Sequence, residues 1–202
     1  MPTTDHPPAE SRLVVGISGA SGVILGIRLL EIAARLDGVE THLILSNAAK
    51  RTIDLETDWS VAKVEELADR SYRANDIAAN VASGSFKASS MVVVPCSMKT
   101  LSGIANSFAD TLLIRAADVA LKDRRPLILV PRETPLHIGH LRLLVRVAEM
   151  GAVVMPPMPA FYHRPKTVED IVDQTVNRIF DVLGIELGDD LFRRWEGPPP
   201  LS

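Results

Sequence analysis

The sequence predicts an α/β fold in which a parallel sheet is covered by helices on both faces. Short apolar runs rich in Val, Ile and Leu alternate with stretches whose apolar residues follow helical spacing. The apolar runs lack strict polar alternation, as expected for strands that are buried on both faces. With 202 residues, of which 47% are hydrophobic, the chain is long enough for one domain with a full core.

Five apolar runs predict strands, and four stretches predict helices. The predicted strands span residues 12–17, 41–45, 91–95, 127–131 and 152–155. The predicted helices span residues 23–36, 110–122, 138–150 and 168–183, the last preceded by Thr167 with Asp170 three residues on, a variant of the capping box. Residues 47–81 contain helical pieces such as 61–70, and no pattern there clearly predicts a strand. The predicted domain covers residues 12–185, between polar tails at 1–11 and 186–202.

Composition excludes several classes of function. Aromatic residues make up 4% of the chain, which argues against a stacking platform for nucleic acid. The 25 acidic residues nearly balance the 22 basic ones, so no overall positive field would attract nucleic acid or an anionic membrane. The apolar runs are too short to span a membrane, and the start lacks an apolar signal core. The single cysteine, Cys96, suits a cytoplasmic protein, and no Cys/His spacing indicates a metal site.

The stretch from Gly16 to Gly22, Gly-Ile-Ser-Gly-Ala-Ser-Gly, joins the first predicted strand to the first predicted helix. Small residues at such a turn let backbone N–H groups approach a phosphate, and the helix N-terminus adds a partial positive charge. A tight turn needed only for packing is the alternative. We interpret the loop as a phosphate-binding site.

Polar residues follow the ends of all five predicted strands, where ligands bind in open α/β sheets. Hydroxyl groups dominate the first three ends and ionisable groups the last two. Ser21, Ser46 and Ser97 fit either helix N-caps or ligand contacts, and one serine can do both. The segments concerned are 19–21, 46–47, 95–100, 131–135 and 156–163.

The ligand that best fits these ends is a mononucleotide such as FMN. A P-loop would continue with Lys and Ser or Thr after the glycines, but Val23 and Ile24 follow Gly22. A nicotinamide site usually has an acidic residue after the second strand, where this chain has Ser46. Neither a nucleoside triphosphate nor NAD is therefore favoured.

Three further features could carry chemistry. Arg115, Asp118 and Lys122 share one face of a largely apolar helix, either as a solvated ion pair or, because Asp118 neutralises only one base, as a phosphate site. Glu133 follows Arg132 at a strand end and fits a proton carrier or a surface ion pair. Cys96 is expected to be a packed thiol, because no base accompanies it.

Long motifs resemble those of the UbiX-type flavin prenyltransferases, also described as phenolic acid decarboxylase subunits. They are GISGASG, SNAAK, LETD, ASGSF, PCSMKTLSGIA, RAADVALKDRRPL, PRETPLHIGHL and MPPMPAFYHRP, in this order from about Leu13 to Trp195. The resemblance implies a Rossmann-like or flavodoxin-like homo-oligomer, a dodecamer with active sites at subunit contacts. It also implies metal-free transfer of a dimethylallyl group from dimethylallyl phosphate to N5 and C6 of reduced FMN, which makes prenylated FMN for UbiD-type decarboxylases.

The same resemblance implies residue roles. Gly19, Ala20 and Ser21 would hold FMN, together with Ser46, Ser97, Met98, Lys99, Thr100 and Arg132. The phosphate of the prenyl donor would be bound by Arg115, Lys122, Tyr162 and Arg178, with Glu56 beside it. Glu133 with Ser21 would relay the proton lost from flavin N5. Cationic side chains around a departing phosphate suit a reaction that proceeds without magnesium.

Two other functions are alternatives for a chain with these motifs. A non-catalytic FMN-binding subunit of a decarboxylase would bind flavin without turnover. A flavin-dependent cysteine decarboxylase would carry a histidine on the first helix, where this chain has none.

Overall fold

The computed structural model describes residues 11–197, so the predicted N-terminal tail lies, apart from Ser11, outside the described residues. The chain divides into two compact units, Met1–Pro157 and Met158–Ser202, which we call unit 1 and unit 2. Unit 1 contains the sheet with its helices, and unit 2 contains one long helix followed by the C-terminal segment.

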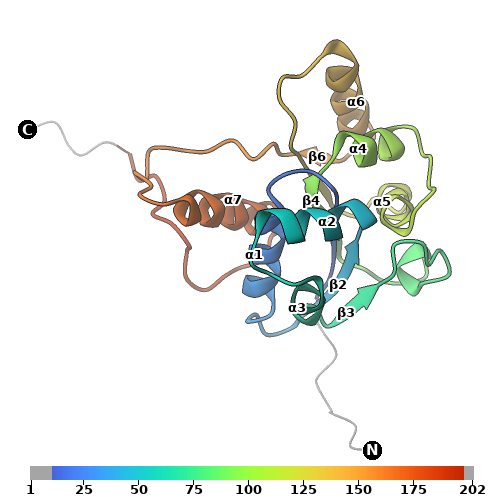
Figure 1. Cartoon of the computed structure of the whole chain (residues 1–202), viewed down its shortest axis with the longest axis horizontal. Coiled ribbons are helices and arrows are strands. Elements are labelled where there is room, and N and C mark those ends of the chain that lie inside the picture. Colours follow the sequence, from blue (N-terminus) through green and yellow to red (C-terminus); the bar gives the residue numbers. More distant parts are fainter. Residues whose placement is uncertain (1–10, 198–202) are drawn as a thin grey trace, which may run out of the picture. The chain divides into compact units, whose positions relative to one another are not determined.

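Unit 1 is built on a parallel sheet whose described strands run in the order β3-β2-β1-β4-β5-β6 (Figure 1). The strands are β1 (Ser11–Ile17), β2 (Val39–Leu45), β3 (Arg70–Tyr72), β4 (Ser90–Cys96), β5 (Leu127–Pro131) and β6 (Val153–Val154). This is the order of Rossmann-type doubly wound sheets. Its direction of growth reverses between β1 and β4, and ligands of such sheets bind outside the carboxyl ends beside that point.

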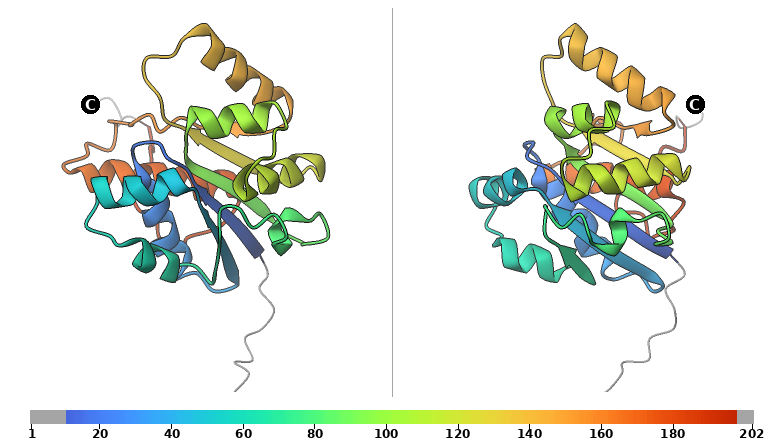
Figure 2. Two further views of the ribbon diagram at one scale, coloured as in Figure 1. Left: turned by 45° about the vertical axis from the view of Figure 1, so that its right-hand side comes forward. Right: turned by 90° about the vertical axis from the view of Figure 1, so that its right-hand side faces the viewer.

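Helices cover both faces of this sheet (Figure 2). They are α1 (Val23–Ala33), α2 (Asn47–Glu56), α3 (Val61–Glu66), α4 (Met98–Ala105), α5 (Leu112–Lys122) and α6 (Ile138–Glu149), with a 3-10 turn, η1 (Asn80–Ala82). A Cβ on Gly16 would lie 3.2 Å from Leu113 of α5, whereas the side chain of Ile17 lies against Gly26 of α1. Because successive side chains of a strand point to opposite faces, α1 and α5 lie on opposite sides of β1.

The core of unit 1 follows the predicted apolar runs. Val15, Leu43, Val92 and Leu129 are fully buried in four adjacent strands. A cluster that includes Val93 joins the sheet to α4, α5 and α6. The prediction of a parallel sheet wrapped by helices is confirmed.

The boundaries differ from the predicted ones at a few places. Residues 47–81, where no strand was clearly predicted, contain β3, which pairs with β2 from His42↔Arg70 to Ile44↔Tyr72. This edge strand has only three residues, two of them exposed, so no apolar pattern marks it. The first helix ends at Ala33, three residues early, and β6 has two residues instead of four.

Unit 2 contains α7 (Val168–Leu183), whose predicted bounds are confirmed. The capping box is present, since the Thr167 side chain accepts a hydrogen bond from Asp170 N and the Asp170 carboxylate accepts one from Thr167 N. Gly184 ends the helix with a φ of 70°. The segment that follows is tied back to the helix, because Leu191 N donates to Asn177 Oδ1 at 2.8 Å.

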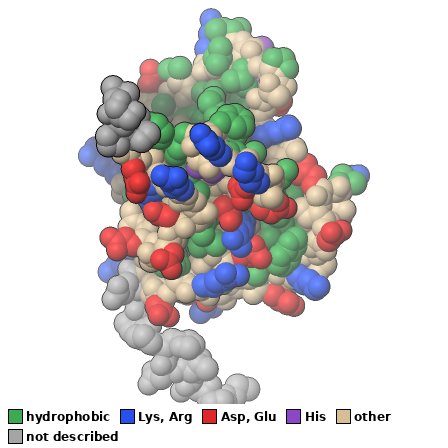
Figure 3. Space-filling view, turned by 90° about the vertical axis from the view of Figure 1, so that its left-hand side faces the viewer, with side chains coloured by type: hydrophobic (Ala, Val, Ile, Leu, Met, Phe, Trp, Pro, Cys, Tyr) green, Lys and Arg blue, Asp and Glu red, His purple; other side chains and the backbone are tan. Residues whose placement is uncertain are grey.

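None of the described helices is long and apolar enough to cross a membrane. On the face drawn in Figure 3, Lys and Arg side chains are intermingled with Asp and Glu side chains. Any anion bound on that face would therefore be held by particular cations rather than by a broad positive field.

Candidate functional site

The carboxyl ends of β1 and β4 are joined by Ser18, a residue that the sequence analysis did not single out. Its side chain is fully buried. Ser18 Oγ donates to Pro95 O at 2.9 Å and accepts from Ser97 N at 2.7 Å, while Ser18 N donates to Pro95 O at 3.2 Å. These bonds fix the two loops at the switch point relative to one another. Only the position of Ser18 within the glycine-rich loop could have indicated this role.

Backbone hydrogen bonds bring the neighbouring strand ends to the same edge. Ser46 N donates to Ile17 O at 3.0 Å, which joins the end of β2 to that of β1. Arg132 N donates to Cys96 O at 3.2 Å, which joins the end of β5 to that of β4. The structure therefore brings together the first four predicted polar ends as one continuous rim, which we call the carboxyl rim.

Two of the three rim serines are helix N-caps. Ser46 Oγ accepts from Ala49 N at 3.0 Å and Ser97 Oγ from Thr100 N at 3.3 Å, so both are N-caps. Ser21 does not cap its helix, because the N-cap of α1 is Gly22, with a φ of 94°. Within the described residues no hydrogen bond of Ser21 Oγ is seen, and the side chain is half-buried.

Gly19 lies where a larger residue would not fit. A Cβ placed on it would come within 2.2 Å of Ala48 Cβ, in the first turn of α2. The first loop and the second helix therefore approach each other closely, and Gly19 remains partly exposed at the rim. Such exposed backbone at the ends of parallel strands is what binding a phosphate requires. The residues fit FMN in this respect.

Glu56 lies at the same rim. Its Oε2 atom accepts from Gly22 N at 2.8 Å, at the N-terminus of α1. A carboxylate at this place is favoured by the helix dipole. Within one chain Glu56 therefore borders the glycine-rich loop rather than the Arg115–Lys122 face, beside which the resemblance would put it.

The ionisable pair at the end of β5 is exposed. Glu133 Oε1 accepts from Thr134 N at 3.0 Å, and no ion pair between Glu133 and Arg132 occurs among the described contacts. Lys99, at the start of α4, lines a hollow of about 490 Å³ together with Phe108 and Asp110. These side chains lie at the surface of a single chain, where a ligand or another chain can reach them.

Cys96 has no catalytic environment. The thiol is buried, and burial raises its pKa to about 12. A thiol with that pKa is protonated at neutral pH and is a poor nucleophile. The prediction of a packed thiol is confirmed.

The basic residues of α5 lie against the segment 82–86. Arg115 Nη1 pairs with Asp118 at 2.8 Å, and Arg115 Nε donates to Ala82 O at 3.1 Å. Lys122 Nζ lies 2.7 Å from the position of a Cβ on Gly84. Asp118 pairs with Arg115 only, as expected, but Lys122 also has a carboxylate partner, because Asp123 pairs with it at 2.7 Å.

Lys122 lies at the opposite edge of the sheet from the carboxyl rim. Phe86, two residues after Gly84, has its ring 5.3 Å from the guanidinium of Arg12 at the start of β1. Ser89 N also donates to Arg12 O. The seven residues of β4 run from the amino end of the strands to the carboxyl end, a distance of about 20 Å at the usual rise per residue. A single chain therefore does not bring Lys122 to the carboxyl rim.

Two hydroxyl groups beside these bases were missed as candidates. Ser83 Oγ and Ser85 Oγ lie 2.9 Å apart, on either side of Gly84. They belong to the motif ASGSF, but its polar residues showed no periodicity, and their closeness to Lys122 depends on the fold.

Unit 2 contains the remaining predicted residues, Tyr162 and Arg178. Tyr162 contacts the rings of His163, Phe192 and Trp195 at centroid distances of 5.7, 6.3 and 5.9 Å. Arg178 Nη1 pairs with Asp181 at 2.7 Å. Both side chains are about half exposed.

Among the described residues no group of three or more His, Cys, Asp or Glu side chains is arranged to hold a metal ion. A Rossmann-type sheet whose carboxyl rim exposes backbone and hydroxyl groups is typical of a nucleotide-binding flavoprotein. Consistent with this class, residues 3–180 match the family model described as Flavoprotein.

Closer relatives narrow the class. The chain is 59% identical to the flavin prenyltransferase UbiX of Escherichia coli K12 over 186 residues, which cover 92% of this chain and 98% of that protein. The structure of AnUbiX in complex with FMN and dimethylallyl pyrophosphate superimposes with a TM-score of 0.90 at 49% identity, covering 94% of this chain and 99% of that one. A dodecameric FMN-dependent Ubix-like decarboxylase from Escherichia coli O157:H7 has a TM-score of 0.88 at 49% identity, with 93% and 100% coverage. The chain belongs to the flavin prenyltransferase family of flavoproteins.

Proposed function

We propose that this enzyme transfers a dimethylallyl group from dimethylallyl phosphate to N5 and C6 of reduced FMN. The product, prenylated FMN, would be the cofactor of a UbiD-type decarboxylase. The observation that carries the proposal is the carboxyl rim, where four strand ends expose backbone and hydroxyl groups in a chain 59% identical to a flavin prenyltransferase. The single cysteine supports a cytoplasmic location.

The rim residues would bind FMN. The loop formed by Gly19, Ala20 and Ser21 presents backbone at the switch point, which suits the phosphate. The other proposed flavin contacts are Ser46, Ser97, Met98, Lys99, Thr100 and Arg132. When FMN is bound, its reduced ring supplies the nucleophilic N5 and C6 atoms.

Proton movement is assigned to Ser21 and Glu133. Ser21 Oγ makes no hydrogen bond within the described chain, so it is available to accept the proton released at N5 while passing its own hydroxyl proton on. Glu133 is exposed at the end of β5, on the same rim, and can take that proton onward as a carboxylate.

The donor phosphate would be bound by Arg115, Lys122, Tyr162 and Arg178, with Glu56 beside it. Guanidinium and ammonium groups stabilise a departing phosphate because its negative charge grows as the allylic bond breaks. The hydroxyl groups of Ser83 and Ser85 add hydrogen-bond donors beside Lys122.

Because Lys122 and the carboxyl rim lie at opposite edges of one sheet, we propose that copies of the chain meet to complete the site, in a dodecamer. The dodecameric relative supports this assembly. An Arg115 or Lys122 side chain from one copy would then reach the FMN held by another.

The test is an anaerobic assay with reduced FMN and either dimethylallyl phosphate or the diphosphate, followed by mass and absorption spectra of the flavin. We expect Arg115→Ala and Arg178→Ala to raise the KM for the donor about tenfold or more, the loss of a charge-assisted hydrogen bond. The Kd for FMN should stay unchanged. The matched control is Lys63→Ala, which removes a cation at an exposed position of α3.

Two results would contradict the proposal. Flavin binding without turnover on either donor would identify a flavin-binding subunit instead. Equal losses of donor and FMN affinity in the arginine variants would show that the assigned roles are wrong.

A further inference from the structure

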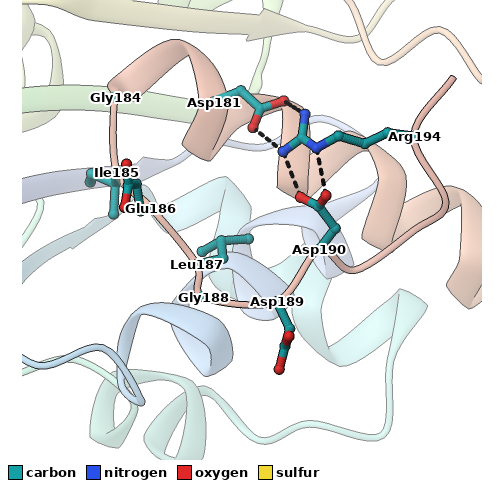
Figure 4. A pocket seen from close by; sticks show the side chains of 9 residues that line it. All are labelled: Asp181, Gly184, Ile185, Glu186, Leu187, Gly188, Asp189, Asp190 and Arg194. Carbon is teal, nitrogen blue, oxygen red and sulfur yellow. Dashed lines mark hydrogen bonds and ion pairs between the residues drawn. The ribbon is translucent and has the colours of Figure 1, made fainter. Parts of the chain in front are cut away.

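One carboxylate in unit 2 serves two arginines. Asp181 Oδ2 accepts from Arg178 Nη1 at 2.7 Å and from Arg194 Nη1 at 3.0 Å, and Asp181 Oδ1 accepts from Arg194 Nη2 at 2.8 Å. Arg194 also donates to Asp190, through Nε at 2.6 Å (Figure 4). Two arginines and two aspartates thus form one connected set of ion pairs with no net charge.

The Arg178 side of this network leaves the guanidinium available to an anion. Arg178 is half exposed, and the described contacts engage a single N–H group, although a guanidinium has five N–H donors. Asp181 lies three residues further along α7, so the pair is formed on one helix face. Asp181 therefore fixes the orientation of the Arg178 side chain and leaves its other N–H groups available to bind an anion.

The Arg194 side of the network holds the C-terminal segment. Arg194 is contributed by residues 184–197, which return along α7 and enclose a hollow of about 400 Å³ against Asp181 (Figure 4). The next residue, Trp195, contacts the ring of Tyr162, as does Phe192. The same carboxylate that orients Arg178 thus also holds the aromatic residues that contact Tyr162.

Geometry makes this network stronger than an ordinary surface pair. A single exposed ion pair contributes little, because solvent screens it and two long side chains must be ordered. Arg194 instead makes two parallel bonds to Asp181, the arrangement that adds geometric specificity to strength. Hydrogen bonds from Arg194 lower the pKa of Asp181, so the carboxylate is ionised at neutral pH.

We infer that Asp181 is a positioning residue for the prenyl donor. It orients Arg178 directly and Tyr162 through Arg194 and the aromatic side chains next to it. The inference rests on the proposed function, in which Arg178 and Tyr162 bind the donor phosphate.

The experiment compares Asp181→Asn with Asp189→Asn in the FMN-loaded enzyme. Both variants lose one negative charge from the same hollow, but Asp189 points away from Arg194 and has no described contact with either arginine (Figure 4). We expect Asp181→Asn to raise the KM for the donor about tenfold, with kcat and the Kd for FMN nearly unchanged. Asp189→Asn should match the wild type.

A second readout follows the C-terminal segment without using activity. In a Trp59→Phe background Trp195 is the single tryptophan, since the chain has two. Its fluorescence anisotropy should fall in Asp181→Asn and in Arg194→Gln, but not in Asp189→Asn. Arg194→Lys, which keeps the charge, should restore part of the anisotropy.

The outcomes separate this inference from the proposed function. If Arg178→Ala raises the KM for the donor but Asp181→Asn matches Asp189→Asn in KM and anisotropy, the inference is wrong and the function stands. If Arg178→Ala leaves the KM unchanged, the assigned role of Arg178 is wrong and the inference falls with it. Should Asp181→Asn fail to fold, an Arg194→Gln variant with unchanged anisotropy would overturn the inference.

Discussion

Replacing Ser18 with Ala removes the side chain that joins the two loops at the switch point. The change breaks the bond from Ser18 Oγ to Pro95 O and leaves Ser97 N–H without its acceptor in a part-buried place. A lost hydrogen bond costs about 1 kcal/mol, and an unsatisfied buried donor about 1–3 kcal/mol. Pro95 O still accepts the hydrogen bond from Ser18 N at 3.2 Å, so this oxygen is not left unsatisfied. We therefore expect the free energy of unfolding to fall by about 2–3 kcal/mol.

Calorimetry would measure this effect as a melting temperature. For a chain of this size each kcal/mol corresponds to about 2–4 °C, so Ser18→Ala should lower Tm by roughly 4–12 °C. The matched variant Ser97→Ala removes the N-cap bond that Ser97 Oγ accepts from Thr100 N, worth about 1 kcal/mol, and the bond that Ser97 Oγ donates to Thr100 Oγ1. A Tm of Ser18→Ala equal to or above that of Ser97→Ala would refute the reasoning, because the loops would then be held by other contacts.

Three further changes test the rim and the core. Gly19→Ala should weaken FMN binding about tenfold or more in a fluorescence titration, because its Cβ would come within 2.2 Å of Ala48 Cβ. Ala48→Gly in the same chain should restore part of the affinity. If it restores none, the lost affinity does not come from this clash. Ser46→Ala should cost about 1 kcal/mol of stability and Ser46→Gly only a few tenths, so equal losses in thermal unfolding would contradict a capping role. Burial lowers the pKa of His42 below 6.5, so the unfolded chain binds a proton more readily, and stability should fall as the pH drops below about 6.5. His42→Gln should flatten the dependence of Tm on pH over that range, and an unchanged slope would assign it to other groups.

Local sequence determined the elements and much of the carboxyl rim. Apolar runs and helical spacing depend on neighbours within one element, which is why α7 was predicted with its bounds and its cap at Thr167. The polar ends of successive strands meet because parallel strands share one direction. Ser46 and Ser97 could therefore be placed at the carboxyl ends of the strands from the sequence alone. The edge strand β3 was not predicted, since three residues held by backbone hydrogen bonds leave no apolar pattern in the sequence.

Tertiary structure alone decided which distant groups meet. Ser18 and Ser97, 79 residues apart, share a hydrogen bond, and Glu56 reaches Gly22 across 34 residues. Arg194 reaches Asp181 because the chain turns back after α7. No periodicity encodes such pairs, because side-chain contacts between distant elements depend on the packing of whole helices and strands. Residue types therefore indicated the chemistry of this protein, and the fold decided that Lys122 and the carboxyl rim lie at opposite ends of the strands in one chain.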